Sequence, residues 1–138
     1  DVDRSRVLKA ENVMIRPSAL VKITDGPRLA LRKMKREEFS SIFVIGEGRT
    51  LQGIVTVDRA IEAVEKKEKD LRNIVDEDVP VTSPEVTLLD LFPMAATARV
   101  PIAVVDDNRK LLGIIVRVSV LSGLIARGDD LDDVSNSG

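Results

Sequence analysis

Residues 41–56 read Ser-Ile-Phe-Val-Ile-Gly-Glu-Gly-Arg-Thr-Leu-Gln-Gly-Ile-Val-Thr, which is the pattern of a strand, a tight turn and a second strand. The pattern returns at residues 101–116, which read Pro-Ile-Ala-Val-Val-Asp-Asp-Asn-Arg-Lys-Leu-Leu-Gly-Ile-Ile-Val. The two copies align without a gap at an offset of 60 residues, so that Gly53 corresponds to Gly113. A repeat of this length predicts two structural units of the same kind in one chain.

The first hairpin lies inside a longer predicted pattern. An alternating run at residues 20–23 predicts a strand before it, and a helix is expected to begin at Pro27 and to end near Glu38. The turn of the hairpin holds Gly46 and Gly48, both of which can take a positive φ. After the hairpin, a second helix is expected.

That second helix is expected to be capped by Asp58 and to run to about Lys69, with a buried side made of Ala60, Ile61 and Val64. The strands before it are strongly apolar. Because a continuous apolar run is typical of a strand buried on both faces, residues 42–45 and 102–105 are expected in the core.

The second copy follows the same order. Residues 79–82 predict its first strand, and Thr87 begins a helix in which Pro93 is expected to cause a kink or a shorter first turn. Ser119 is expected to cap a last helix that ends at Arg127. Each copy is therefore predicted as β-α-β-β-α, and the whole chain as an α/β (α+β) fold with pseudo-twofold symmetry.

The predicted domain boundaries follow from the repeat. Residues 1–16 are interpreted as a linker from a preceding domain, with a short helix or turn near its end. The first repeat is placed at 17–76 and the second at 77–128. Residues 129–138 are interpreted as an acidic, mobile tail.

The composition excludes several classes of function. The chain has no Cys and no His, which removes thiol chemistry and the usual zinc and copper sites. A net charge of −2 does not favour nucleic acid. Without Trp or Tyr, one copy cannot form an aromatic cage for a quaternary ammonium ligand. No apolar run is long enough for direct membrane insertion, and the charged start is no secretory signal, so a cytoplasmic regulatory or binding module is expected.

The repeat resembles the cystathionine-β-synthase (CBS) domain in its tandem arrangement. The resemblance covers about Glu11 to Arg127. It is carried by Val13-Met14 before the first strand, by the helix residues Ala30, Leu31 and Met34, by the stretch 100–106, and by Gly53-Ile54-Val55-Thr56 and Gly113-Ile114-Ile115-Val116. It implies a tandem CBS domain pair that regulates a partner and commonly forms a homodimer through its CBS helices, here those after Asp58 and Ser119.

A narrower resemblance concerns residues 24–32, Thr-Asp-Gly-Pro-Arg-Leu-Ala-Leu-Arg. They are similar to a stretch in the C-terminal region of the ATP-binding subunit of glycine betaine/proline ABC importers. The phosphate loop of such a subunit, Gly-x-x-x-x-Gly-Lys-[Ser/Thr], does not occur in the chain. The resemblance therefore implies a non-catalytic regulatory appendage, whose partners are an ATP-binding ABC-type ATPase domain of the same chain and the transporter's membrane subunits. Its implied location is the cytoplasmic side of the inner membrane, peripheral through the transporter.

The CBS family implies a nucleotide site that this chain matches only in part. The family pattern is Gly, two apolar residues, Thr or Ser, two residues, then Asp. The first repeat keeps Thr56, but Arg59 stands at the carboxylate position and Asp58 comes one residue early. The second repeat has Val116 and Ser119 at these positions. The candidate ligand-binding residues are Thr56, Asp58, Arg59, Val100, Pro101 and Ser119, and the alternative role of Thr56, Asp58 and Ser119 is helix capping.

Two ligand classes stay open, an adenosine nucleotide and a cyclic dinucleotide, the second through the arginines Arg28, Arg59, Arg99 and Arg117. Ionic strength is a further candidate signal. A tail that carries Asp129, Asp130, Asp132 and Asp133 would leave a basic surface such as that around Arg28 as salt rises, because salt screens the attraction. The alternative is an inert, solubilising terminus.

Two other functions remain as alternatives. The chain could be a nucleotide-sensing CBS pair from another parent, such as a channel or a metabolic enzyme. A free-standing enzyme would have to work with carboxylates or lysines alone, and the sequence shows no cluster of them.

Overall fold

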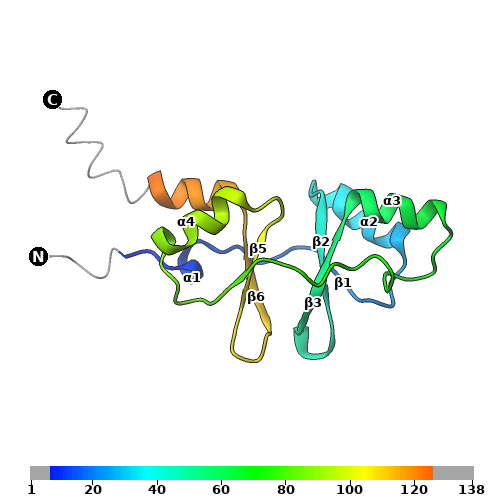
Figure 1. Cartoon of the computed structure of the whole chain (residues 1–138), viewed down its shortest axis with the longest axis horizontal. Coiled ribbons are helices and arrows are strands. Elements are labelled where there is room, and N and C mark those ends of the chain that lie inside the picture. Colours follow the sequence, from blue (N-terminus) through cyan, green and yellow to red (C-terminus); the bar gives the residue numbers. More distant parts are fainter. Residues whose placement is uncertain (1–6, 126–138) are drawn as a thin grey trace, which may run out of the picture. The chain divides into compact units, whose positions relative to one another are not determined.

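The computed structural model describes residues 7–125, which form two compact units (Figure 1). The first-repeat unit holds residues 17–79 together with 105–111. The second-repeat unit holds residues 7–16, 80–104 and 112–125. Each unit contains most of one three-stranded sheet and the helices that cover it.

The first-repeat unit follows the predicted order. Its strands are β1 (Leu20–Val21), β2 (Ser41–Ile45) and β3 (Leu51–Thr56), and its helices are α2 (Pro27–Glu37) and α3 (Val57–Glu65), with a 3-10 turn η2 (Glu47–Arg49). The sheet order is β1-β2-β3, with β1 parallel and β3 antiparallel to β2. The helix α2 begins with Pro27 at its first position, where the missing N–H costs no helical hydrogen bond.

The second-repeat unit repeats this order. It contains α1 (Ala10–Val13), β4 (Val81–Thr82), α4 (Leu88–Thr97), β5 (Ile102–Val105), β6 (Leu111–Ile115) and a helix over residues 117–125. The sheet order is β4-β5-β6, and β4 is parallel to β5. Pro93 lies inside the ten-residue helix α4, as the sequence predicts. The β-α-β-β-α pattern is therefore confirmed in both copies.

Each unit has its own core. In the first, Val21, Met34, Val44, Val55 and Leu71 are among the buried residues. In the second, the segment before the first repeat takes part, because Ala10 of α1 is fully buried with Leu88 and Leu91 of α4. The backbone N–H of Ala10 donates to Val86 O at 2.8 Å, and that of Leu88 donates to Leu8 O at 2.9 Å.

Each sheet is also extended by one residue of a connecting segment. In the first-repeat unit, Ile54 and Asp76 exchange two backbone hydrogen bonds of 2.9 and 2.8 Å. In the second-repeat unit, Ile15 and Ile114 do the same at 2.9 Å each. A glycine stands next to each bridge in β3 and β6, which is where the repeat places Gly53 and Gly113.

Several local expectations are wrong in detail. The cap of α3 is Thr56 and not Asp58, because the Thr56 hydroxyl accepts from the Arg59 N–H, and the helix ends at Glu65 before Lys69. Ile61 is 46% exposed, since the buried side of α3 is formed by Ala60 and Ala63.

Two further expectations differ from the structure. The last helix begins at residue 117, so Ser119 lies in its first turn instead of capping it, and its N–H donates to Val116 O. Its predicted end at Arg127 lies outside the described residues. Of the two glycines in the β2–β3 turn, only Gly48 has a positive φ, of 68°, whereas Gly46 is extended at −108°. The second residue of the turn with a positive φ is Arg49, at 63°.

Candidate functional site

Three candidate residues meet at the start of α3, in the first-repeat unit. Thr56 is half-buried at the N-cap, and its Oγ1 accepts from Arg59 N at 3.4 Å. The side chains of Asp58 and Arg59 are exposed in the first turn. The hydroxyl is therefore used as a cap, and one carboxylate and one guanidinium remain at a helix N-terminus, where partial positive charge favours an anion.

The other three candidates belong to the second-repeat unit. Val100 and Pro101 are half-buried just before β5. Ser119 is half-buried and lines an open pocket of about 440 Å³ together with Asn12, Val13 and Ser122. Ser119 and Pro101 share no hydrogen bond among the described residues. The six candidates thus form two groups, one in each unit.

The helix α2 carries a cationic face. Its exposed cations are Arg28, Arg32, Lys35 and Arg36, whose spacing of three, four and eight residues places them along one side of the helix. Only Arg36 is paired within residues 7–125, by a 3.4 Å contact with the neighbouring Glu37. Lys33 is different, since its Nζ donates to Leu20 O at 2.7 Å. The α2 cationic face is therefore a concentrated positive surface on a chain with a net charge of −2.

The remaining regulatory candidates, Asp129, Asp130, Asp132 and Asp133, lie outside the described residues. Within residues 7–125, no group of three or more acidic side chains is placed to hold a metal ion. No helix of that part of the chain has the length and hydrophobicity that crossing a bilayer requires.

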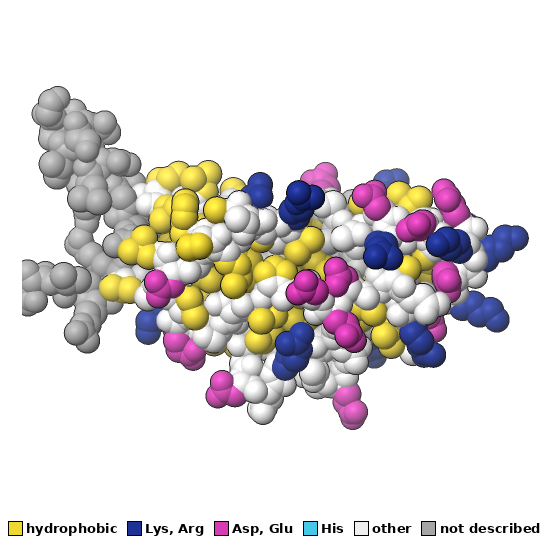
Figure 2. All heavy atoms as spheres, in the orientation of Figure 1, with side chains coloured by type: hydrophobic (Ala, Val, Ile, Leu, Met, Phe, Trp, Pro, Cys, Tyr) yellow, Lys and Arg dark blue, Asp and Glu magenta, His cyan; other side chains and the backbone are white. Residues whose placement is uncertain are grey.

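Sequence reasoning missed a solvent-facing apolar surface on the second-repeat unit. Figure 2 shows hydrophobic side chains gathered over its helices, whereas charged side chains cover those of the first-repeat unit. We define the apolar helix face by five residues that are 49–65% exposed: Leu89 and Phe92 of α4, and Val118, Leu121 and Ile125 of the 117–125 helix.

The two helices of this face pack closely. A Cβ on Gly123 would lie 2.8 Å from Leu88 Cδ2, so the glycine allows the 117–125 helix to approach α4. The signal in the sequence is the adjacent apolar pairs Leu88-Leu89 and Leu91-Phe92. One member of each pair is buried and the other is exposed, which makes the helix apolar on more than one side.

Two β-α-β-β-α units with a shared offset define a tandem pair of small α/β repeats. The CBS domain pattern matches residues 10–66 and 71–126, and the chain belongs to the CBS domain family. Domains of this family are regulatory modules and not catalysts.

Curated relatives of the chain include transport ATP-binding proteins. The chain is 42% identical over 124 residues, 90% of its length, to the glycine betaine/carnitine transport ATP-binding protein GbuA of Listeria monocytogenes. It is 33% identical over 129 residues, 94% of its length, to the glycine betaine transport ATP-binding protein OpuAA of Bacillus subtilis. The chain spans 31% and 30% of these two proteins.

Solved structures show the same fold. Staphylococcus aureus OpuCA has a TM-score of 0.74 at 22% identity, over 83% of this chain and 97% of that one. CBSX2 in complex with AMP has a TM-score of 0.73 at 20% identity, over 86% and 97% of the chains. CbpB in complex with c-di-AMP has a TM-score of 0.72 at 18% identity, over 94% and 87%. At these identities the likeness concerns the fold alone.

Proposed function

We propose that this chain is the regulatory module of the ATP-binding subunit of a glycine betaine/L-proline ABC importer, in which it tunes osmoprotectant uptake. The observation that carries this proposal is the 42% identity to a glycine betaine/carnitine transport ATP-binding protein along 90% of the chain. The parent's ATPase domain binds ATP and works with membrane subunits, so the module lies at the cytoplasmic face of the membrane. The two CBS repeats occupy residues 17–76 and 77–128.

Ionic strength is the first proposed signal. The α2 cationic face offers four cations, and the tail of residues 129–138 carries the complementary carboxylates. The Debye length falls from about 10 Å at 0.1 M salt to about 3 Å at 1 M salt. Rising salt therefore weakens the attraction between tail and helix and shifts the population toward a released, active arrangement.

Deleting residues 129–138 is the test of this signal. In the intact transporter in liposomes, the deletion is expected to remove most of the increase in uptake that salt produces. Charge reversal at Arg28 and Arg32 is expected to act in the same direction, because it removes the other side of the same attraction. A salt response unchanged by the deletion would contradict the tail's role.

A nucleotide is the second proposed signal. The fold is shared with CBSX2 in complex with AMP and with CbpB in complex with c-di-AMP. In this chain the α3 N-terminus, with Thr56, Asp58 and Arg59, would receive a phosphate, since a helix N-terminus and a guanidinium both favour anions. Val100, Pro101 and Ser119 are the corresponding candidates of the second-repeat unit.

Two threonines allow a matched test of this site. Thr56 caps α3 with a 3.4 Å bond, and Thr87 caps α4 with a 3.3 Å bond to Asp90 N. Both Thr56→Ala and Thr87→Ala are expected to lower the free energy of unfolding by about 1 kcal/mol, as measured by urea denaturation. Only Thr56→Ala is expected to weaken the calorimetric affinity for AMP or c-di-AMP, by about tenfold. Equal affinities of the two variants for both ligands would remove Thr56 from the site.

Homodimerisation is the third part of the proposal. The apolar helix face holds five large side chains that are about half exposed or more, on a part of the unit with few charges. A surface that meets its own copy across a twofold axis must not place like charges opposite each other. The apolar helix face satisfies this requirement and the α2 cationic face does not.

A further inference from the structure

A surface pocket of about 600 Å³ lies at the turn between β2 and β3, in the first-repeat unit. Its lining includes Lys22, Ile23, Ile45, Glu47, Arg49 and Gln52. Strand β3 runs from this turn toward the start of α3. At a rise of about 3.3 Å per residue, Gln52 and Thr56 are separated by about 13 Å. The turn pocket is therefore distinct from the proposed phosphate position at α3.

The turn places one polar group, the Gln52 amide, at the wall of the pocket. A Cβ added to Gly46 would lie 2.5 Å from Gln52 Nε2 and 2.9 Å from its Cδ, so the Gln52 amide rests against the Gly46 backbone. Gly48 has a φ of 68°, which allows the chain to reverse within η2. The amide offers one acceptor and two donor hydrogens to a bound molecule.

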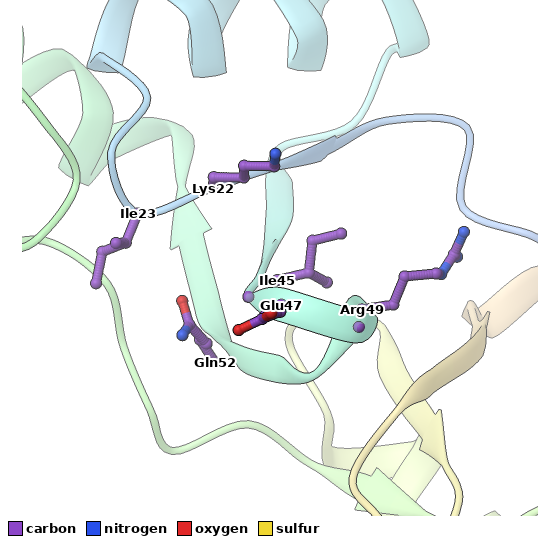
Figure 3. A pocket seen from close by; sticks show the side chains of 8 residues that line it. Lys22, Ile23, Ile45, Glu47, Arg49 and Gln52 are labelled. Carbon is purple, nitrogen blue, oxygen red and sulfur yellow. The ribbon is translucent and has the colours of Figure 1, made fainter.

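The charged side chains around this amide have opposite signs. Figure 3 shows the Glu47 carboxylate directed toward the side of the pocket that holds Gln52, whereas Arg49 extends away from it. Lys22 lies on another part of the rim. Within residues 7–125, the side-chain charges of Lys22, Glu47 and Arg49 make no ion pair.

The mixed charges select against simple ions. An anion alone would face Glu47, and a cation alone would face Lys22. A zwitterion finds a partner for each of its charges. A quaternary ammonium has no N–H to donate and would need an aromatic face, and the chain contains no Trp or Tyr. A primary or secondary ammonium, in contrast, donates directly to a carboxylate.

We propose that the turn pocket binds a small apolar α-amino acid as its zwitterion. The ammonium donates to Glu47, the carboxylate accepts from Lys22 and the Gln52 amide, and the side chain contacts Ile23 and Ile45. A volume of about 600 Å³ lies within the range of about 300–1,000 Å³ that small-molecule pockets occupy.

The pocket is connected to the turn of the second hairpin. A second depression of about 370 Å³ shares Ile23 and Gln52 with it and is also lined by Arg109. The Arg109 Nε donates to Leu51 O at 3.1 Å, and Leu51 N donates to Arg109 O at 2.9 Å. Gln52 and Arg109 both line the second depression. A ligand that displaces the Gln52 side chain would therefore change the surroundings of Arg109, and this links binding in the turn pocket to the β5–β6 turn.

The test compares two zwitterions of nearly equal shape, L-proline and its N,N-dimethyl derivative proline betaine. Neither changes the ionic strength, so charge screening stays constant during the titration. Calorimetry and amide chemical shifts of the 138-residue chain are expected to show L-proline binding with a Kd of about 1 mM, since solvent-exposed charges contribute little each. Proline betaine is expected to bind at least about tenfold more weakly, because its nitrogen donates no hydrogen bond.

Two variants identify the pocket. Glu47→Gln is expected to weaken L-proline binding by about fivefold or more, whereas Glu65→Gln, the same change at an exposed position on α3, is expected to leave it unchanged. The proposal is overturned if L-proline shows no saturable binding up to about 50 mM. Equal binding of the two zwitterions, or equal binding by wild type and Glu47→Gln, overturns it as well. None of these measurements uses transport, so the proposed importer function can fail independently.

Discussion

Gly53→Ala is expected to lower the free energy of unfolding by about 3 kcal/mol, whereas Gly113→Ala is expected to lower it by about 1 kcal/mol. The repeat makes the two glycines equivalent in sequence, but their neighbours differ. A Cβ on Gly53 would lie 2.5 Å from Asp76 O, a backbone atom. That carbonyl accepts from Ile54 N at 2.9 Å, so moving it also disturbs the bridge between β3 and the connecting segment.

At Gly113 the nearest atoms belong to a flexible side chain. A Cβ there would lie 2.6 Å from Met14 Sδ and 2.9 Å from Met14 Cγ, with Ile15 O at 3.1 Å. A methionine side chain can rotate away at small cost, so the backbone bridge to β6 is largely kept.

Urea denaturation of both variants checks this difference, with Gly48→Ala as a control. A Cβ on Gly48 would have no atom within 4 Å, but Gly48 has a φ of 68°. The Gly48→Ala substitution is therefore expected to lower the free energy of unfolding by about 1 kcal/mol through backbone conformation alone. A Gly113→Ala variant less stable than Gly53→Ala would contradict the assignment of the rigid contact to Asp76.

The glycines also show what the sequence could and could not predict. Their shared offset fixes two equivalent hairpins, and a glycine inside a strand signals the close approach of another chain segment. The sequence does not say which segment approaches. In the structure it is Asp76 at Gly53 and Ile15 at Gly113, and these pairings depend on long-range topology that no local pattern encodes.

The sequence predicts which residue types can cap α3, but not which of them is the N-cap. Thr56 and Asp58 are both favourable N-caps, and choosing Asp58 was wrong because β3 continues without a break to Thr56. The predicted buried side of α3 was wrong for a related reason. A start two residues earlier and tertiary packing place Ala63, instead of Ile61, against the core.

The residues of the candidate site stay a prediction from the family pattern, whereas their local geometry comes from the structure. The family pattern identifies Thr56 and Arg59, yet only the structure shows that the hydroxyl is already bound to the Arg59 N–H. The turn pocket escaped the sequence because Lys22 and Gln52 are separated by 30 residues of chain and come together only through the pairing of β1, β2 and β3.

The second large expected effect concerns self-association. Sequence resemblance implies contacts through the helices after Asp58 and Ser119, but the two helices differ in their exposed sides. The exposed side of α3 carries Asp58, Arg59, Glu62 and Glu65 around Ile61, whereas the 117–125 helix exposes Val118, Leu121 and Ile125. The dimer is therefore expected to form through the second-repeat unit.

Leu121→Glu is expected to convert the dimer into a monomer. Leu121 is 57% exposed, so the substitution leaves the core of the unit intact. At a twofold contact it places two carboxylates in an apolar interface, at a cost of about 2 kcal/mol per copy. Two copies correspond to an increase in the dimer Kd of about a thousandfold.

Sedimentation velocity at several concentrations measures this change, and Ile61→Glu is the matched control. Ile61 is 46% exposed and is the large exposed hydrophobic residue of α3, so the same chemical change there tests whether α3 joins the contact. Ile61→Glu is expected to leave the dimer unchanged, because the charged residues around Ile61 keep that side of α3 hydrated. A monomeric wild-type chain, or a dimer that survives Leu121→Glu, would contradict self-association through the apolar helix face.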